Sequence, residues 1–198
     1  STLLASSAAS DVYKRQLDLC TNLTKLSINA WQVSLGDIDL SAFTKLTDVT
    51  MSPTAGYTSI QLPDGIKSFK SIIKYANHEP VGPTTLDLTQ YTDLEYVSVM
   101  DSYGEPAALK SLNVSGLSKL ALLYVGGTPE VNIANCPLLT TCIKNNGTYE
   151  SGFYWSGSSS SQTIIVESEA KRDQLKASWK KVMGYDEENP ANAWTIQQ

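Results

Sequence analysis

The sequence predicts a β-rich, right-handed solenoid of about six short coils, closed at its C-terminal end by a strand and an amphipathic helix. Two observations lead to this prediction. An apolar pattern returns at regular intervals through most of the chain, and it stops near residue 145. Composition agrees, because 41% of the 198 residues are hydrophobic and 18% are charged. These proportions are typical of a folded chain and unlike those of a disordered one.

The repeated block begins with two apolar residues on either side of a polar one and ends in the pattern LxxLxL. Copies start at residues 38, 60, 86, 112 and 131, which are 19 to 26 residues apart, as in leucine-rich repeats. The copy at residue 60 needs one inserted residue to align. Alternation in LxxLxL predicts a short strand with one face inward, and stacked coils would join these strands into a parallel sheet. Six copies in phase argue against the alternative, an ordinary β-sandwich.

The first copy covers residues 17–28, and its two leading positions fall on Arg15 and Gln16. Residues 11–16, DVYKRQ, are the in-frame translation of GATGTGTATAAGAGACAG, which resembles the transposon end used in sequencing-library preparation. We therefore expect residues 1–16 to be adapter-derived sequence or a disordered segment, and we leave them out of the predicted fold.

The phrase LDLS followed by LxxL, repeated over about residues 17–145, resembles the leucine-rich-repeat surface proteins of gut and oral bacteria known as the BspA-like family. The resemblance implies a secreted or cell-surface bacterial protein. The chain departs from the pattern in two respects. The asparagine expected after LxL is mostly missing, with only Asn29 and Asn145 near it, and Lys74 and Lys144 occupy positions that should be apolar. We expect looser coils at those two lysines.

A cap is predicted after the turn signal Asn146-Gly147. Residues 148–162, aromatic and then serine-rich, are expected to form a loop, followed by a strand over residues 163–166. Ser168 is suited to cap a helix over about residues 169–183 that ends at Gly184. The apolar face of this helix, and the last core contacts after it, are expected to consist of Leu175, Trp179, Val182 and Met183, then Trp194 and Ile196. The predicted domains are thus a solenoid over residues 17–147 and a cap over residues 148–198.

Motifs for catalysis are missing from the sequence. The one histidine, His78, has no second histidine spaced for a metalloprotease, and the phosphate-binding and nucleophile-elbow motifs do not occur. Cys20, Cys136 and Cys142 are too few and wrongly spaced for a metal site, and we expect buried free thiols. We expect no enzyme activity, cofactor or metal. The net charge of −5 argues against nucleic acid, and no apolar run is long enough for a membrane span.

Binding residues are expected on the outward face of the LxxLxL strands. In-phase stacking predicts that Tyr96, Met100, Leu122 and Tyr124 lie together, with Thr141 and Ile143 beside them in the next coil. Tyrosine and methionine suit a recognition surface because they bury much area at a modest cost in entropy. Longer insertions after the strands carry Tyr57 and Tyr103 and are expected to line one edge of the solenoid.

Two functions are therefore open. The first is a non-enzymatic binding module that recognises a protein or glycan partner through the sheet and one loop edge. The second is a structural spacer within a larger surface protein, with no ligand of its own. In either case we expect a monomer located outside the cell or at its surface.

Overall fold

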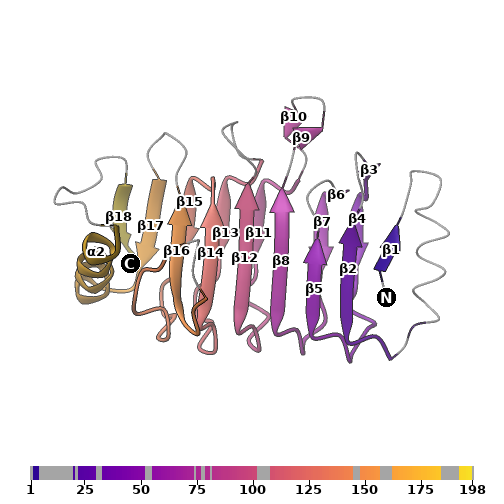
Figure 1. The fold of residues 1–198 in the computed structure, drawn as a ribbon, viewed down its shortest axis with the longest axis horizontal. Coiled ribbons are helices and arrows are strands. Elements are labelled where there is room, and N and C mark those ends of the chain that lie inside the picture. The colour runs from indigo at the N-terminus through magenta and orange to yellow at the C-terminus, as the bar shows by residue number, and fades with distance from the viewer. Residues whose placement is uncertain are drawn as a thin grey trace.

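The computed structural model shows a parallel β-solenoid of about five turns with a C-terminal helix (Figure 1). It describes residues 2–4, 20, 22–29, 33–51, 55–73, 75–76, 79–80, 82–101, 108–144, 148–156, 162–183 and 192–197. The prediction of a β-rich solenoid with a C-terminal helix is confirmed. His78 and Tyr103 lie outside the described residues.

One face of the solenoid is a seven-stranded parallel sheet, here called the main sheet. Its strands in spatial order are β1 (Thr2–Leu4), β2 (Lys25–Asn29), β5 (Asp48–Met51), β8 (Ser68–Ile73), β12 (Tyr96–Asp101), β14 (Leu122–Gly126) and β16 (Gly152–Ser156). Five of these strands were expected from the repeat. The pairing of Thr2–Leu4 with β2 differs from the expectation that residues 1–16 lie outside the fold.

The opposite face is a second parallel sheet in two parts. One part pairs β4 (Asp37–Asp39) with β7 (Ser59–Gln61). The other contains β11 (Thr85–Asp87), β13 (Ser111–Asn113), β15 (Glu130–Asn132), β17 (Gln162–Val166) and β18 (Asn192–Ile196). Two further short pairs occur in the described residues, namely β3 (Val33–Ser34) with β6 (Ala55–Gly56) and β9 (Tyr75–Ala76) with β10 (Glu79–Pro80). In Figure 1, β9 and β10 project from one edge.

The core lies between the sheets and is built in rows. Parallel in-register pairing places one apolar residue of each main-sheet strand directly beside its neighbour, which gives the buried row Leu26, Val49, Phe69, Val97, Leu123 and Phe153. Six buried side chains in one continuous row remove far more apolar surface from water than a single three-residue strand could. The alternation in LxxLxL therefore correctly predicted which face of these strands points inward.

Polar residues between the apolar pairs of the second sheet hold the turns that follow. Asp39 accepts hydrogen bonds from the backbone N–H and hydroxyl of Ser41, and Asp87 does the same for Thr89. Asn113 and Asn132 accept from the N–H two residues on. In this chain the turn-holding Asp or Asn therefore lies between the two apolar residues of a second-sheet strand. The repeat pattern led us to expect an asparagine after LxL instead.

The third coil departs from the others. Eleven residues separate Ile38 from Val49, whereas nine separate their pairing partners Ile60 and Phe69. The expectation of one inserted residue is thus wrong, because the coil is two residues shorter than the one before it. In the shortened turn, Gln61 stands where Asp39 stands in the coil before. The residue two positions on is Pro63, which has no N–H, so no side-chain acceptor is needed there.

The C-terminal end is covered by α2 (Glu169–Met183), which has the bounds expected from the sequence. The Ser168 hydroxyl accepts the N–H of Lys171 at 3.2 Å, as predicted for an N-cap. Leu175 is fully buried, and the Trp179 ring lies 5.0 Å from that of Trp155. Trp194 and Ile196 pack on the same core. Among the residues described, no helix is both long and apolar enough to cross a membrane.

The last coil corrects two expectations. Residues 141–144 form no strand of the main sheet and make only an isolated bridge between Cys142 and Phe153. The strand beside β14 is instead β16, which comes from the aromatic segment that was expected to be a loop. Phe153 and Trp155 supply large inward-facing rings beside β14, while Cys142 and Ile143 are buried next to β16.

Candidate binding face

The outward face of β12, β14 and β16 carries a cluster of large side chains. We call this cluster the tyrosine face, and its members are Tyr96, Met100, Leu122, Tyr124, Tyr149 and Tyr154. Three strands position it, because Tyr96 pairs with Leu122, Ser98 with Tyr124, and Tyr124 in turn with Tyr154. Odd-numbered neighbours in β12 point into the core, so Tyr96, Ser98 and Met100 must point outward.

Three tyrosine rings form a row across these strands. The centroids of Tyr96 and Tyr124 lie 6.0 Å apart at an interplanar angle of 43°, and those of Tyr124 and Tyr154 lie 5.8 Å apart at 42°. Both separations fall in the range of favourable tilted aromatic pairs. The Lys70 ammonium sits 4.9 Å from the Tyr96 ring centroid and ends the row on the β8 side. Contacts between neighbours hold the rings, so little side-chain freedom remains to be lost when a ligand binds.

A shallow hollow of about 290 Å³ lies within the tyrosine face. It is lined by Tyr96, Ser98, Met100, Leu122, Tyr124, Thr148 and Tyr149, and none of these side chains carries a formal charge. Burial raises the pKa of the Tyr124 phenol, and the neighbouring Tyr96 and Tyr149 add to the shift. The hollow therefore offers rings and neutral hydroxyl groups at neutral pH.

The structure brings together all four residues predicted for the sheet, namely Tyr96, Met100, Leu122 and Tyr124. Thr141 and Ile143 do not join them, because Gly152 and Tyr154 take those places beside β14. Tyr149 and Tyr154 were missed as binding candidates. The signal was present as the alternation in residues 153–155, where Phe153 and Trp155 face inward and the tyrosine between them faces outward.

Gly152 makes this arrangement possible. Its φ of +142° lies in a region that side chains rarely adopt. A Cβ at this position would lie 2.5 Å from the Ile143 Cγ2 atom and 3.1 Å from the Thr141 carbonyl oxygen. The missing side chain lets residues 141–143 pass close by while β16 pairs with β14.

Tyr57 lies elsewhere than expected. It was predicted on an exposed loop edge, but only 2% of its surface is accessible. Its hydroxyl is hydrogen-bonded to the Ser71 hydroxyl at 2.9 Å, and burial raises its pKa to about 12. Ser71 occupies an inward position that is apolar in neighbouring strands, so Tyr57 supplies the partner that this buried hydroxyl needs.

The titratable side chains that the structure describes do not gather into a cluster suited to metal binding. Within the described ranges, no group of three or more His, Cys, Asp or Glu residues is placed to hold a metal ion. Cys136 and Cys142 are buried free thiols, as expected, and burial raises their pKa to about 11 and about 12. Such thiols are poor nucleophiles at neutral pH. Cys20 corrects the same expectation, because it is exposed.

Comparison of the chain with protein-family models, curated sequences and solved structures gave no significant match.

Proposed function

We propose that this chain is a non-enzymatic binding module that recognises a protein or glycan partner through the tyrosine face. The single observation that carries the proposal is the row of Tyr96, Tyr124 and Tyr154 across three adjacent strands. All three rings are partly exposed. A contiguous group of partly exposed tyrosines is costly to keep in water, and tyrosine is enriched where proteins bind partners. Nothing in the packing of the solenoid core requires them, since the inward residues of the same strands already fill it.

The chemistry of the face favours a neutral partner. Its hollow combines aromatic rings with the hydroxyls of Ser98, Thr148 and the tyrosines. A sugar ring or a peptide segment each offers an apolar surface flanked by hydrogen-bonding groups, and this lining matches both. A nucleic acid fits poorly, because among the described residues Lys70 alone places a cation over a ring of the row, and the chain carries a net charge of −5.

The proposal extends to the type of solenoid and its setting. The buried LxxLxL positions support a right-handed leucine-rich-repeat identity with about six coils, the first of them over residues 17–28. A resemblance to BspA-like proteins supports a bacterial origin and a place outside the cell or on its surface. A monomer is proposed on the same ground.

An array of glycans and surface proteins tests the proposal. The double variant Tyr96→Ala/Tyr124→Ala is expected to lose at least tenfold in affinity for whatever the array retains. It should remain folded, at a cost in stability of about 1–3 kcal/mol for the two aromatic pairs. Tyr124→Phe keeps the ring and separates stacking from hydrogen bonding by the hydroxyl. Thr50→Ala is the matched control, because it alters an outward residue of the main sheet two strands before β12.

Other outcomes would favour other functions. If no array hit depends on the two tyrosines, the chain is better described as a structural spacer. The spacer hypothesis is supported by the regular stacking of the coils, which are also joined by ion pairs such as Lys67–Glu95 at 3.0 Å. A hydrolase activity that survives repurification would contradict both functions.

A further inference from the structure

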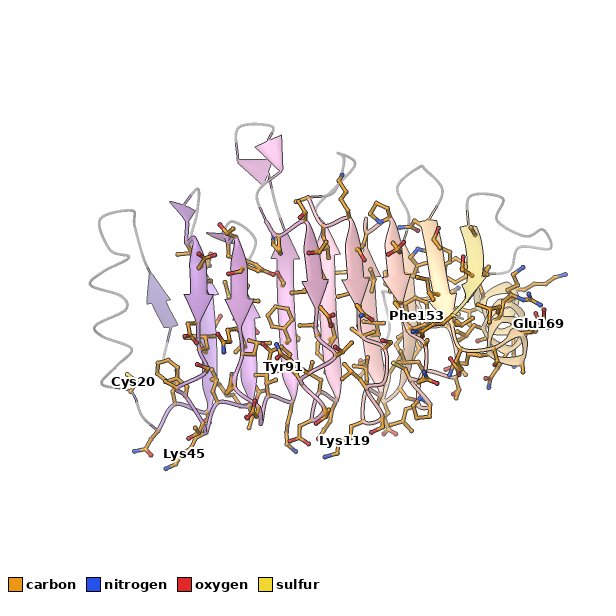
Figure 2. The ribbon with its side chains drawn as sticks, turned by 180° about the vertical axis from the view of Figure 1, so that it is seen from behind. Cys20, Lys45, Tyr91, Lys119, Phe153 and Glu169 are labelled. Atoms are coloured by element: carbon orange, nitrogen blue, oxygen red, sulfur yellow. The ribbon has the colours of Figure 1, made fainter. Side chains whose placement is uncertain are left out.

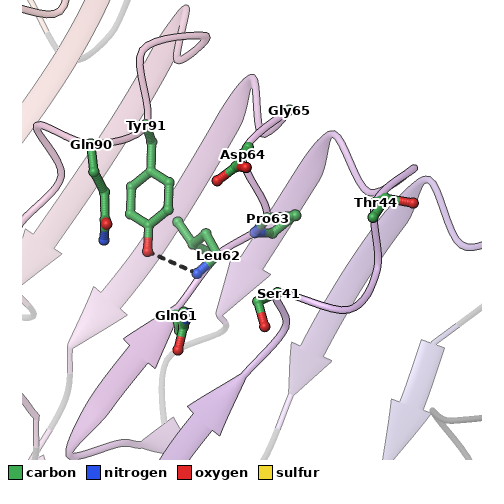
Figure 3. A pocket seen from close by; sticks show the side chains of 9 residues that line it. All are labelled: Ser41, Thr44, Gln61, Leu62, Pro63, Asp64, Gly65, Gln90 and Tyr91. Carbon is green, nitrogen blue, oxygen red and sulfur yellow. Dashed lines mark hydrogen bonds between the residues drawn. The ribbon is translucent and has the colours of Figure 1, made fainter.

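A second hollow, of about 450 Å³, lies at the edge of the solenoid where the second sheet turns into the main sheet (Figure 3). We call it the edge hollow. Turns from three consecutive coils enclose it: Ser41 and Thr44 from the first, residues 61–65 from the second, and Gln90 and Tyr91 from the third. Figure 2 shows Tyr91 on this side of the molecule, above the edge marked by Lys45 and Lys119. These residues are distinct from those of the tyrosine face.

The edge hollow follows from the shortened coil. The turn after β7 has two residues fewer than the turn after β4, so it is recessed between its longer neighbours. The ladder of the second sheet is interrupted at the same point, because β7 pairs with β4 and β11 with β13. In other coils the matching N–H donates to the next coil, as Leu40 does to the Gln61 carbonyl at 2.8 Å. Here the Leu62 N–H donates to the Tyr91 hydroxyl at 3.0 Å instead.

The Tyr91 contact closes the floor of the hollow without filling it. Both Tyr91 and Leu62 are buried, and Pro63 beside them is buried as well. The Leu62 N–H, which would otherwise be left without a partner at this break, is thereby hydrogen-bonded. The floor of the hollow at this interruption of the repeat is therefore well packed, and its buried Leu62 N–H has a hydrogen-bond acceptor.

The rim is polar and has hydrogen-bonding capacity to spare. It carries the amides of Gln61 and Gln90, the carboxylate of Asp64 and the hydroxyls of Ser41 and Thr44. Gln61, Asp64 and Gln90 are exposed, and their side chains make no hydrogen bond to another described residue. At the equivalent positions, by contrast, Asp39 and Asp87 are engaged in their own turns. Two amides and a carboxylate facing one hollow provide several donors and acceptors without any cationic group.

We propose that the edge hollow is a binding site for a small neutral polyhydroxylated ligand, a sugar ring or the end of a glycan chain. Its volume lies in the range of about 300–1,000 Å³ that small-molecule sites occupy. Vicinal hydroxyls can donate to Asp64 and pair with both amides, while the buried Leu62 and Pro63 offer an apolar floor. An anion is disfavoured by Asp64, and a metal ion would find one carboxylate where several oxygen ligands are needed. The site is independent of the tyrosine face.

Titration of the whole chain with neutral monosaccharides, glucose, galactose, mannose and N-acetylglucosamine, tests the proposal by ligand-observed NMR. We expect saturable binding of at least one of them with a Kd of about 1 mM, the range for a ligand of this size. Gln61→Ala/Gln90→Ala should weaken it at least tenfold. Gln90→Ala is structurally mild, because the first of the three coils has Ala42 at the same place in its turn.

An occluding variant makes the test independent of the hydrogen-bonding residues. A Cβ at Gly65 would have no atom within 4 Å, so the backbone has room for a side chain at this position on the lining, and Gly65→Trp is designed to place an indole in or over the hollow. It should abolish binding, whereas Gly65→Ala should retain it. Thermal unfolding and circular dichroism establish that each variant is folded.

The outcomes separate this site from the tyrosine face. Binding lost in Gly65→Trp and kept in Tyr124→Ala supports the edge hollow. Binding lost in Tyr124→Ala and kept in Gly65→Trp places the sugar on the tyrosine face, and it overturns this inference while supporting the proposed function. No saturable binding of any of the four sugars at tens of millimolar also overturns it.

Discussion

Removing one hydroxyl, in Tyr91→Phe, tests the explanation given for the break in the repeat. The Tyr91 hydroxyl is the partner of the buried Leu62 N–H at 3.0 Å, and within the described part of the chain that donor has no second acceptor. A buried donor left without a partner costs about 1–3 kcal/mol. For a chain of this length about 1 kcal/mol lowers Tm by about 2–4 °C, so a mid-range loss of about 2 kcal/mol predicts a fall of about 4–8 °C.

Thermal unfolding followed by circular dichroism measures the fall, and amide hydrogen exchange locates it. The Leu62 amide should exchange faster in Tyr91→Phe than in the native chain, because local opening no longer breaks a hydrogen bond. Tyr57 and Ser71 provide the control. Tyr57→Phe leaves the Ser71 hydroxyl buried alone, and adding Ser71→Ala should recover most of the loss because both partners are then gone. An unchanged Tm together with unchanged exchange at Leu62 would refute the role assigned to Tyr91.

Three further predictions follow from single residues. Gly152→Ala should lower stability by about 2 kcal/mol or more and weaken the pairing of β16 with β14, seen as loss of amide protection in both strands, because its Cβ would clash. Hydrogen bonds from Ser41 hold the pKa of Asp39 below its usual value, so this carboxylate stabilises the fold above the unfolded pKa of about 3.9, and the contribution is lost as pH falls through the folded pKa. Asp39→Asn keeps the acceptor and should flatten the acid limb of a stability–pH curve; an identical curve would contradict the assignment. A thiol reagent at pH 8 should modify Cys20 quickly and the other two thiols only after unfolding, since burial raises the pKa of Cys142 to about 12.

Most of the solenoid could be predicted because its signal is local and repeated. Alternating pairs such as Leu86 and Leu88 recur in phase, and each copy of the repeat indicates that the same positions face inward. The helix bounds were equally readable, since Ser168 caps the start and the apolar spacing around Leu175 fixes the buried side. These features need no knowledge of distant residues.

The last coil could not be predicted because two segments compete for one position. Residues 141–144 carry the repeat pattern, and nothing near them in sequence shows that residues 152–156 will take the place beside β14. The outcome depends on the burial of Phe153 and Trp155 and on the close approach that Gly152 allows. The same non-local choice brings Tyr154 next to Tyr124 and so decides how far the tyrosine face extends.

Tyr57 and the edge hollow illustrate two other limits. An insertion after a strand looks exposed, but Tyr57 is buried because Ser71 in the next coil needs a hydroxyl partner. In the sequence, the deletion behind the edge hollow resembles an insertion, because only the pairing of Ile38 with Ile60 and of Val49 with Phe69 shows that the turn is two residues shorter. The hollow itself appears only when the neighbouring coils are stacked on either side.

The most direct test of binding at the tyrosine face uses the methionines as reporters. The chain has three, of which Met100 lies on the tyrosine face and Met51 is fully buried in the core. With ¹³C-methyl methionine, the Met100 signal, assigned through Met100→Leu, should shift progressively as the array-selected partner is added, while the Met51 signal stays in place. A partner that binds but leaves the Met100 methyl unmoved would contradict the central claim.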